Sequence, residues 1–318
     1  MDNRLQGLSG SIVAIVTPFN NDGTIDFRGL SNLIDFHLLN KTDGILVCGT
    51  TGETPTLTER ECEQVISFTV KQVNGRIPVI AGTGANATKK TIENCIAAEQ
   101  LGVDGLLIVG PYYNKPTASG YLQHFSEVAQ STSLPIIIYN VPGRTGSNIP
   151  TEVIIDLAEL FENIIGIKEA SGDLIQMMDI IDRRPEGFKI FSGCDDLAFP
   201  LMCLGGDGCI SVVANQIPFE FSEMLRLAQE GNFDSARKLH YRYLELMNIN
   251  FIESNPQPVK TSLAMMGLIK DNFRSPMCRM EDRNRNKLEN ALIGVNLITK
   301  NQVHMNQYYN SHDKLVLV

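Results

Sequence analysis

The sequence has no tryptophan, only five histidines, and no two cysteines in a CxxC pair. Its seven cysteines are scattered, and their number is odd; they are Cys48, Cys62, Cys95, Cys194, Cys203, Cys209 and Cys278. A disulfide framework uses an even set of cysteines, and a zinc site needs cysteines or histidines at short spacings. We therefore expect no bound metal, and a reducing compartment such as the cytoplasm.

Long apolar runs and an excess of basic residues are also missing. Residues 11–16 form an apolar run that is too short for a signal peptide or a membrane span. The chain of 318 residues has 27 Lys and Arg against 36 Asp and Glu, a formal net charge of −9. A nucleic-acid surface needs clustered Lys and Arg. We expect neither a membrane nor a nucleic acid as partner.

Eight short apolar runs, rich in β-branched residues, recur along the first two thirds of the chain. They are residues 11–16, 44–49, 77–82, 105–110, 135–140, 164–168, 188–193 and 208–213. Such runs, separated by amphipathic stretches such as residues 151–163, are typical of parallel strands alternating with helices. Eight strands also close a barrel. The pattern predicts a (β/α)8 TIM barrel over residues 1–217.

An open, doubly wound sheet is the alternative fold. Residues 81–92, AGTGANATKKTI, contain a GxGxxA pattern after a strand. A dinucleotide site also needs an acid at the end of the next strand, which here ends in Val109-Gly110. We interpret the pattern as a tight turn.

The strand pattern stops after Val213. Residues 217–251 are typical of two helices with a break at Gly231-Asn232, and another helix is expected to start near Thr261. We expect a C-terminal helical region over residues 218–298 that packs on the barrel. The polar residues 299–318 predict a mobile tail or an additional edge element.

Function in a β/α barrel concentrates at the carboxyl ends of the strands. GTTGE (49–53) offers hydroxyl and backbone N–H groups that suit a small carboxylate or phosphate, or simply form a βα turn with a helix cap. PYYNKP (111–116) has adjacent tyrosines, which are more typical of loop packing or a subunit contact. Arg144, in YNVPGRTG (139–146), matches a carboxylate or is an exposed loop arginine.

Lys168 ends an apolar strand. Strict alternation places it on the same face as Ile164 and Gly166, with Ile165 and Ile167 on the opposite face. An inward face would bury the amine at the barrel mouth, and an outward face would leave it as a charge at the end of the strand.

The neighbours of Lys168 favour the inward position. Burial disfavours a charged amine, and the neutral amine is the form that attacks a ketone to give a Schiff base. Tyr139, at the end of the preceding strand, and the hydroxyls of GTTGE are suited to relay protons. A backbone nest and Arg144 would each bind a carboxylate. This set predicts a class I aldolase that acts on a 2-oxo acid and needs no metal.

GTTGE, the tyrosine of YNVP and the lysine of GIKEASGD (166–173) resemble the motifs of the pyruvate-dependent class I aldolases. This family includes dihydrodipicolinate synthase and N-acetylneuraminate lyase, and the resemblance covers residues 8–295. PYYNKP and Arg144 resemble the dihydrodipicolinate synthase branch. That resemblance implies condensation of pyruvate with L-aspartate 4-semialdehyde to 4-hydroxy-tetrahydrodipicolinate, in diaminopimelate and lysine biosynthesis.

The same resemblance assigns roles to residues. Lys168 would form the imine with pyruvate, and Tyr139 would transfer protons through Thr50 to Tyr113, which a neighbouring subunit contributes. Thr51 would hold the pyruvate carboxylate. The remaining substrate-binding residues would be Arg144, for the carboxylate of the semialdehyde, Gly193, and Ile210 through its backbone carbonyl. The resemblance also implies a homotetramer built as a dimer of dimers, with no cofactor.

Three other functions compete with this one. An aldolase for a 2-keto-3-deoxy sugar acid or N-acetylneuraminate generally lacks the arginine found here at position 144. A binding or regulatory paralogue without turnover does not require the complete set of reactive residues. A barrel that uses nicotinamide or flavin would show the absorbance of its cofactor.

Two departures from the family concern regulation and one strand end. Family members inhibited by lysine carry a histidine and a glutamate where this chain has Glu59 and Lys90, although Asn86 and Tyr112 are retained. We expect weak or absent inhibition by lysine, because Lys90 would repel the amino groups of the inhibitor. Cys194 stands where many relatives have an acid, and the sequence gives no physical account of its effect.

Overall fold

The computed structural model describes residues 5 and 7–299, and within them eight parallel strands form a closed barrel in the order β1 to β8. The strands are β1 (Gly10–Ala14), β2 (Gly44–Val47), β3 (Val79–Gly82), β4 (Gly105–Val109), β5 (Ile136–Asn140), β6 (Ile164–Glu169), β7 (Lys189–Ser192) and β8 (Gly208–Ser211). Strand β1 pairs with both β2 and β8, which closes the ring. The predicted (β/α)8 barrel and all eight predicted strands are confirmed.

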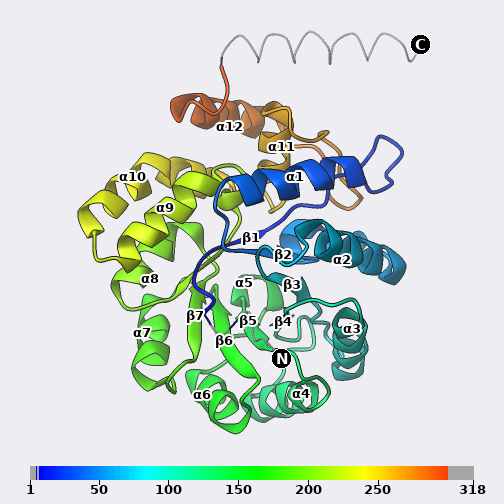
Figure 1. The fold of residues 1–318 in the computed structure, drawn as a ribbon, viewed down its shortest axis with the longest axis vertical. Helices are drawn as coiled ribbons and strands as arrows, with labels where there is room; N and C mark the ends of the chain where they lie inside the picture. The colour runs from blue at the N-terminus through cyan, green and yellow to red at the C-terminus, as the bar shows by residue number, and fades with distance from the viewer. Residues whose placement is uncertain (1–4, 6, 300–318) are drawn as a thin grey trace.

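Helices alternate with these strands and surround the barrel (Figure 1). They are α1 (Phe27–Leu39), α2 (Glu59–Val73), α3 (Thr88–Gln100), α4 (Ala118–Gln130), α5 (Pro142–Thr145), α6 (Thr151–Leu160), α7 (Leu174–Arg183), α8 (Ala198–Cys203), α9 (Pro218–Gln229), α10 (Phe233–Ile249), α11 (Gln257–Met265) and α12 (Asp282–Gly294). Short 3-10 helices are η1 (Thr50–Gly52), η2 (Thr54–Thr56), η3 (Asp195–Leu197) and η4 (Val213–Asn215). In the described part of the chain, none of the helices is long and apolar enough to span a bilayer.

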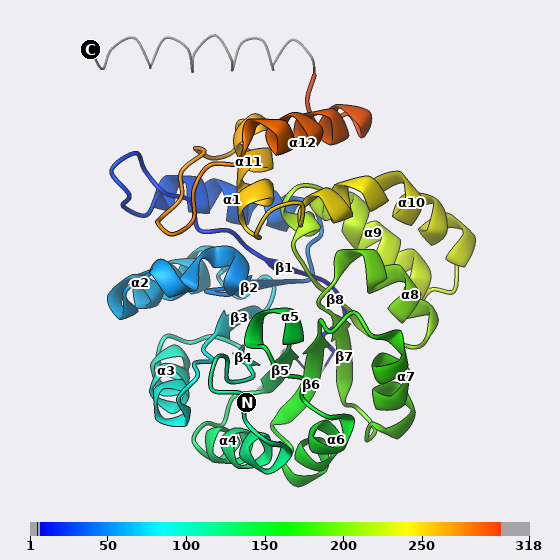
Figure 2. The same cartoon turned by 180° about the vertical axis from the view of Figure 1, so that it is seen from behind.

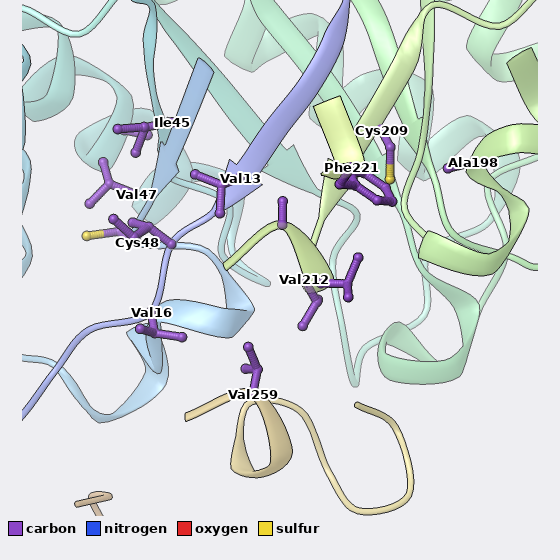
Figure 3. Packing of buried hydrophobic residues seen from close by; sticks show 14 of the residues in the cluster. Val13, Val16, Ile45, Val47, Cys48, Ala198, Cys209, Val212, Phe221 and Val259 are labelled. Atoms are coloured by element: carbon purple, nitrogen blue, oxygen red, sulfur yellow. The ribbon is translucent and has the colours of Figure 1, made fainter. Parts of the chain in front are cut away.

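Two apolar layers hold the barrel together. The inner cluster fills the space within the strands; its members are Leu5, Leu8, Ile12, Ala14, Leu46, Ile80, Leu107, Ile137, Tyr139, Val141, Phe191 and Ile210. The outer cluster lies between strands and helices and includes Val13, Ile45, Val47 and Phe221 (Figure 3). Neighbouring strand residues alternate between the two clusters, because successive side chains of a strand point to opposite faces.

The predicted face of Ile164 is wrong. Ile164 lies in the outer cluster with Ile167, whereas Ile165 packs against the inner cluster. The pairing with β5 skips Ile165, so one additional residue is inserted and the alternation is interrupted there. From Gly166 onward the alternation is regular. Lys168 therefore keeps its predicted inward face, although Ile164 does not share it.

The C-terminal helices lie beside the barrel and over one part of it (Figures 1 and 2). Helix α9 follows β8 and packs against β1 and α8, so it completes the eighth β/α unit. Helix α11 begins at Gln257, four residues before the predicted start. The division of the chain at residue 217 stays a prediction. Of the expected tail, residues 300–318 lie outside the described residues.

Candidate active site

Lys168 and Tyr139 lie side by side at the carboxyl ends of β6 and β5. They are partners in the strand register, and the side chains are 5% and 8% exposed. The Lys168 Nζ atom is 4.4 Å from the centroid of the Tyr139 ring. Within residues 5 and 7–299, Lys168 forms no ion pair. A buried amine without a carboxylate partner, beside a phenol ring, is suited to act as a nucleophile.

Gly193 makes room for Lys168. A Cβ atom at this position would lie 2.5 Å from the Cβ of Ala170 and 3.0 Å from the Cε of Lys168, so any side chain would clash with Ala170 and press on the lysine stem. Ile210 is fully buried in β8, with its side chain in the inner cluster. Gly193 directly follows β7 and lies beside the lysine stem, and Ile210 lies within β8.

The GTTGE turn forms the end of β2. Thr50 and Thr51 begin the 3-10 helix η1, which Glu53 closes by donating its backbone N–H to the carbonyl of Thr50 at 3.1 Å. Thr51 is buried, and its hydroxyl accepts a hydrogen bond of 3.0 Å from the side-chain amide of Asn255. The turn thus presents backbone N–H groups and hydroxyls, a combination that binds a carboxylate.

A capped helix fixes the far side of this turn. Thr58 is the N-cap of α2 and forms a capping box with Glu61, because each accepts a hydrogen bond from the backbone of the other. Arg274 then binds the Glu61 carboxylate through two hydrogen bonds. These contacts lower the pKa of Glu61 to about 2, with the Arg274 hydrogen bond as the largest cause. The start of α2 is therefore firmly held.

Arg144 lies on α5, the short helix that Figure 2 shows over the middle of the ring. Its side chain is exposed, and its Nη2 atom donates to the backbone carbonyl of Asn255 at 3.3 Å. Asn255 thus contacts both Arg144 and Thr51, the two residues that sequence reasoning assigned to carboxylates. No motif pointed to Asn255, because it lies 204 residues from Thr51 along the chain.

Two buried carboxylic acids support the strand ends around Lys168. Asp195 accepts backbone hydrogen bonds from Val212 and Val213, and Glu169 accepts from the backbone of Ser171. Burial raises the pKa of Asp195 and of Glu169, and their hydrogen bonds act in the opposite direction. Through these hydrogen bonds, Asp195 fixes the loop after β7 and Glu169 fixes the loop after β6.

Tyr113 is the predicted residue that the chain does not bring to Lys168. Its side chain is 88% exposed, and its backbone has a φ of 74°, which is uncommon for a residue other than glycine. In the part of the chain that the structure describes, its hydroxyl forms no hydrogen bond with Thr50 or Tyr139. The predicted relay through Tyr113 is therefore not formed within one chain.

Across residues 5 and 7–299, no group of three or more His, Cys, Asp and Glu side chains is placed to hold a metal ion. The polar groups at the barrel mouth are instead an amine, a phenol, hydroxyls and a guanidinium.

The model of the Dihydrodipicolinate synthetase family matches residues 7–294. The chain belongs to this family. A 4-hydroxy-tetrahydrodipicolinate synthase from Prosthecochloris aestuarii is 45% identical over 292 residues, which cover 92% of this chain and 98% of that relative. The family assignment therefore rests on nearly the whole length of both chains.

Solved structures of the family share the fold. The dihydrodipicolinate synthase of Aquifex aeolicus is 48% identical, with a TM-score of 0.90 over 92% of this chain and 100% of the other. The chloride-inhibited enzyme of Acinetobacter baumannii, solved with pyruvate, is 44% identical, with a TM-score of 0.89 over 91% and 99%. The barrel and its C-terminal helices are thus those of the family.

Proposed function

We propose that this chain is a lyase of the class I aldolase type that condenses pyruvate with L-aspartate 4-semialdehyde. The product is 4-hydroxy-tetrahydrodipicolinate, a step of diaminopimelate and lysine biosynthesis. The observation that carries this proposal is the buried, unpaired amine of Lys168 against the ring of Tyr139, in a chain of the dihydrodipicolinate synthetase family.

The reaction follows from the placement of these two groups. The Lys168 amine adds to C2 of pyruvate, and loss of water from the adduct gives an iminium ion. The iminium draws electrons from C3, so a proton leaves C3 and an enamine forms. The enamine carbon then attacks the aldehyde carbon, whose oxygen takes up a proton, and the iminium re-forms at C2. The amino group of the semialdehyde adds to C2, which closes the ring and releases the Lys168 amine. Tyr139, beside the amine, is suited to donate and accept these protons, with the Thr50 hydroxyl as relay.

The two carboxylates of the substrates have separate binding groups. Thr51 and the backbone N–H groups of its turn bind the pyruvate carboxylate, at the end of β2. Arg144 binds the carboxylate of the semialdehyde, because its planar guanidinium matches a carboxylate in two hydrogen bonds. Asn255 touches both residues, so the two carboxylate sites share one support.

The mechanism requires neither metal nor organic cofactor, since the iminium itself is the electron sink. We place the enzyme in the cytoplasm. All seven cysteines are free thiols in the structure, which agrees with a reducing compartment.

Borohydride reduction in the presence of pyruvate tests the proposal. Reduction would convert the imine into a stable amine, and peptide mapping would find the pyruvyl group on Lys168. A Lys168→Arg variant, which keeps the charge but cannot form this imine, is the control. A folded protein that gains no adduct with pyruvate in excess would rule out the Schiff-base mechanism.

A second assay identifies the aldehyde. Enzyme with pyruvate is offered L-aspartate 4-semialdehyde, N-acetylmannosamine or a sugar-derived aldehyde, and consumption of pyruvate is followed. Turnover with the semialdehyde alone is expected, because Arg144 recognises its carboxylate. Preferred turnover of a sugar would assign the chain to another branch of aldolases.

We also propose a homotetramer in which Tyr113 enters the active site of a second copy. The high exposure of Tyr113 supports this, because burial of an exposed tyrosine ring at a subunit interface stabilises the assembly. A second set of apolar side chains, Ile175 and Met178 on α7 and Leu204 after α8, is also exposed and would gain from burial at a second interface.

Mixing two inactive variants tests the role of Tyr113. Tyr113→Phe and Lys168→Ala chains are unfolded and refolded together. A mixed pair then contains one site with both residues intact, so activity returns if Tyr113 acts across the interface. Activity that stays absent in mixed dimers of the expected mass would place Tyr113 within its own chain.

A further inference from the structure

Lys260 is a second buried lysine, and the mechanism does not use it. It lies on α11, and both its side chain and that of Glu53 are almost completely buried, at 0% and 1% exposed. The Lys260 ammonium donates to the Glu53 carboxylate and lies 4.2 Å from the centroid of the Phe19 ring. The other carboxylate oxygen of Glu53 accepts from the backbone N–H of Arg274 at 3.2 Å. An ion pair this deeply buried connects the C-terminal helices with the end of β2.

Glu53 holds a demanding backbone position. Its φ of 55° and ψ of 33° are left-handed, a conformation that a residue with a side chain rarely adopts. Its N–H closes η1 on Thr50, and its carbonyl accepts from the backbone and hydroxyl of Thr56 in η2. Glu53 is therefore the corner between the two 3-10 helices. Side-chain contacts must hold it there, because the backbone alone disfavours this conformation.

The same segment of chain contacts the turn a second time. Asn255 lies five residues before Lys260 and donates its side-chain amide to the hydroxyl of Thr51. Val259, between them, is fully buried in the outer cluster and points toward the barrel beside Val16 and Val212 (Figure 3). Residues 255–260 thus combine two polar contacts with a packed apolar anchor.

We propose that Lys260 and Glu53 are positioning residues for the carboxylate-binding turn, so that α11 sets the affinity of the enzyme for its 2-oxo acid. The inference deepens the proposed function and rests on it. Lys260 fixes the Glu53 side chain, Glu53 fixes the corner, and the corner sets the direction of the N–H groups and hydroxyls of Thr50 and Thr51. Neither residue touches the reacting atoms.

Removal of one charge should move the turn. Without Lys260, the Glu53 carboxylate would stay buried with only the Arg274 N–H as partner, and a buried unpaired charge is strongly unfavourable. The turn relieves this by shifting toward water. A lost or misaligned hydrogen bond to a charged group weakens binding by about ten- to a hundredfold, so we expect at least about a tenfold weaker pyruvate site.

Three variants separate positioning from general stability. Lys260→Met removes the charge at similar length, and Glu53→Gln keeps the shape and a hydrogen-bonding oxygen while removing the opposite charge. Arg184→Met is the matched control. It breaks the partly buried pair of Arg184 with Asp207, which joins the end of α7 to the start of β8 at the amino ends of the strands.

Two measurements are made on each folded protein. The first is the pyruvate concentration that gives half-maximal borohydride trapping, together with kcat and the KM of each substrate. We expect half-saturation to rise about tenfold or more in Lys260→Met, with a smaller rise in Glu53→Gln and smaller changes in kcat. The second is hydrogen exchange of residues 49–57, which should become faster in the same two variants and stay unchanged in Arg184→Met.

The results distinguish the two proposals. If the wild type traps no pyruvate, the proposed function fails, and the exchange of residues 49–57 alone decides whether Lys260 and Glu53 hold the turn. If the wild type traps pyruvate, the inference is overturned when Lys260→Met and Glu53→Gln both reach half-maximal trapping at the same pyruvate concentration as the wild type. An equal change in Arg184→Met would also overturn it, because the effect would then be one of stability. Faster exchange confined to the two variants, with the weaker pyruvate site, supports it.

Discussion

We expect His37 to make the folded protein less stable in mild acid. It lies near the end of α1, its side chain is fully buried, and its Nδ1 atom is 3.1 Å from the hydroxyl of Thr42. Burial lowers the pKa of His37 from 6.5 to about 3. Below pH 6.5 the unfolded chain therefore binds a proton that the folded chain excludes. The stability supplied by a neutral His37 is complete above pH 6.5 and is lost as the pH falls toward 3.

The magnitude follows from the pH interval. For each pH unit over which the unfolded chain binds one more proton than the folded chain, the free energy of unfolding falls by about 1.4 kcal/mol. The one and a half units between pH 6.5 and pH 5 therefore correspond to about 2 kcal/mol. Urea unfolding at pH 7 and pH 5 measures this for the wild type and for His37→Asn, whose amide nitrogen takes the place of Nδ1. The wild type should lose about 2 kcal/mol more than the variant over this interval. Parallel losses in the two proteins would refute the reasoning, because other titrating groups act equally in both.

Three further predictions concern the mouth of the barrel and its surroundings. The Lys90 ammonium would repel the amino groups of lysine, and its ion pair with Glu59 at 2.5 Å leaves that carboxylate already bound. We therefore expect lysine to inhibit with a constant above about a millimolar, and a lower constant in a steady-state assay would contradict this. Burial raises the pKa of the Cys194 thiol to about 12, so iodoacetamide at pH 8 should alkylate the exposed Cys203 and spare Cys194, as peptide mapping would show. Arg144→Met should raise the KM of the semialdehyde at least about tenfold while pyruvate trapping stays unchanged; equal effects on both substrates would remove its assigned role.

The sequence predicted the barrel well because its strands are buried on both faces. A strand that is covered on both faces reads as a continuous apolar run, and turn residues mark its ends. The same regularity located the reactive side chains, since a barrel collects function at the carboxyl ends of its strands. Lys168 and Tyr139 were predicted as neighbours, and the register pairs them.

Irregular local structure was beyond such reasoning. The residue inserted at Ile165 reverses the alternation within β6, and nothing in a run of similar apolar residues marks which one is additional. Asn255 and Lys260 were missed for another reason. Their partners in the GTTGE turn lie more than 200 residues away along the chain. A contact of that separation leaves no periodicity and no local motif.

The two buried lysines show why burial alone does not identify a catalytic residue. Lys260 is more deeply buried than Lys168, yet it is paired with the Glu53 carboxylate. An amine must lose a proton to become a nucleophile, and this ion pair stabilises the protonated form. Burial lowers the pKa of Lys260, and the charge of Glu53 opposes that shift. Lys168 has no such partner, and Gly193 leaves space at its stem. The distinction between a structural and a reactive lysine thus lies in the neighbours of the amine. Borohydride trapping should accordingly label Lys168 and leave Lys260 unmodified, although both lysines are buried.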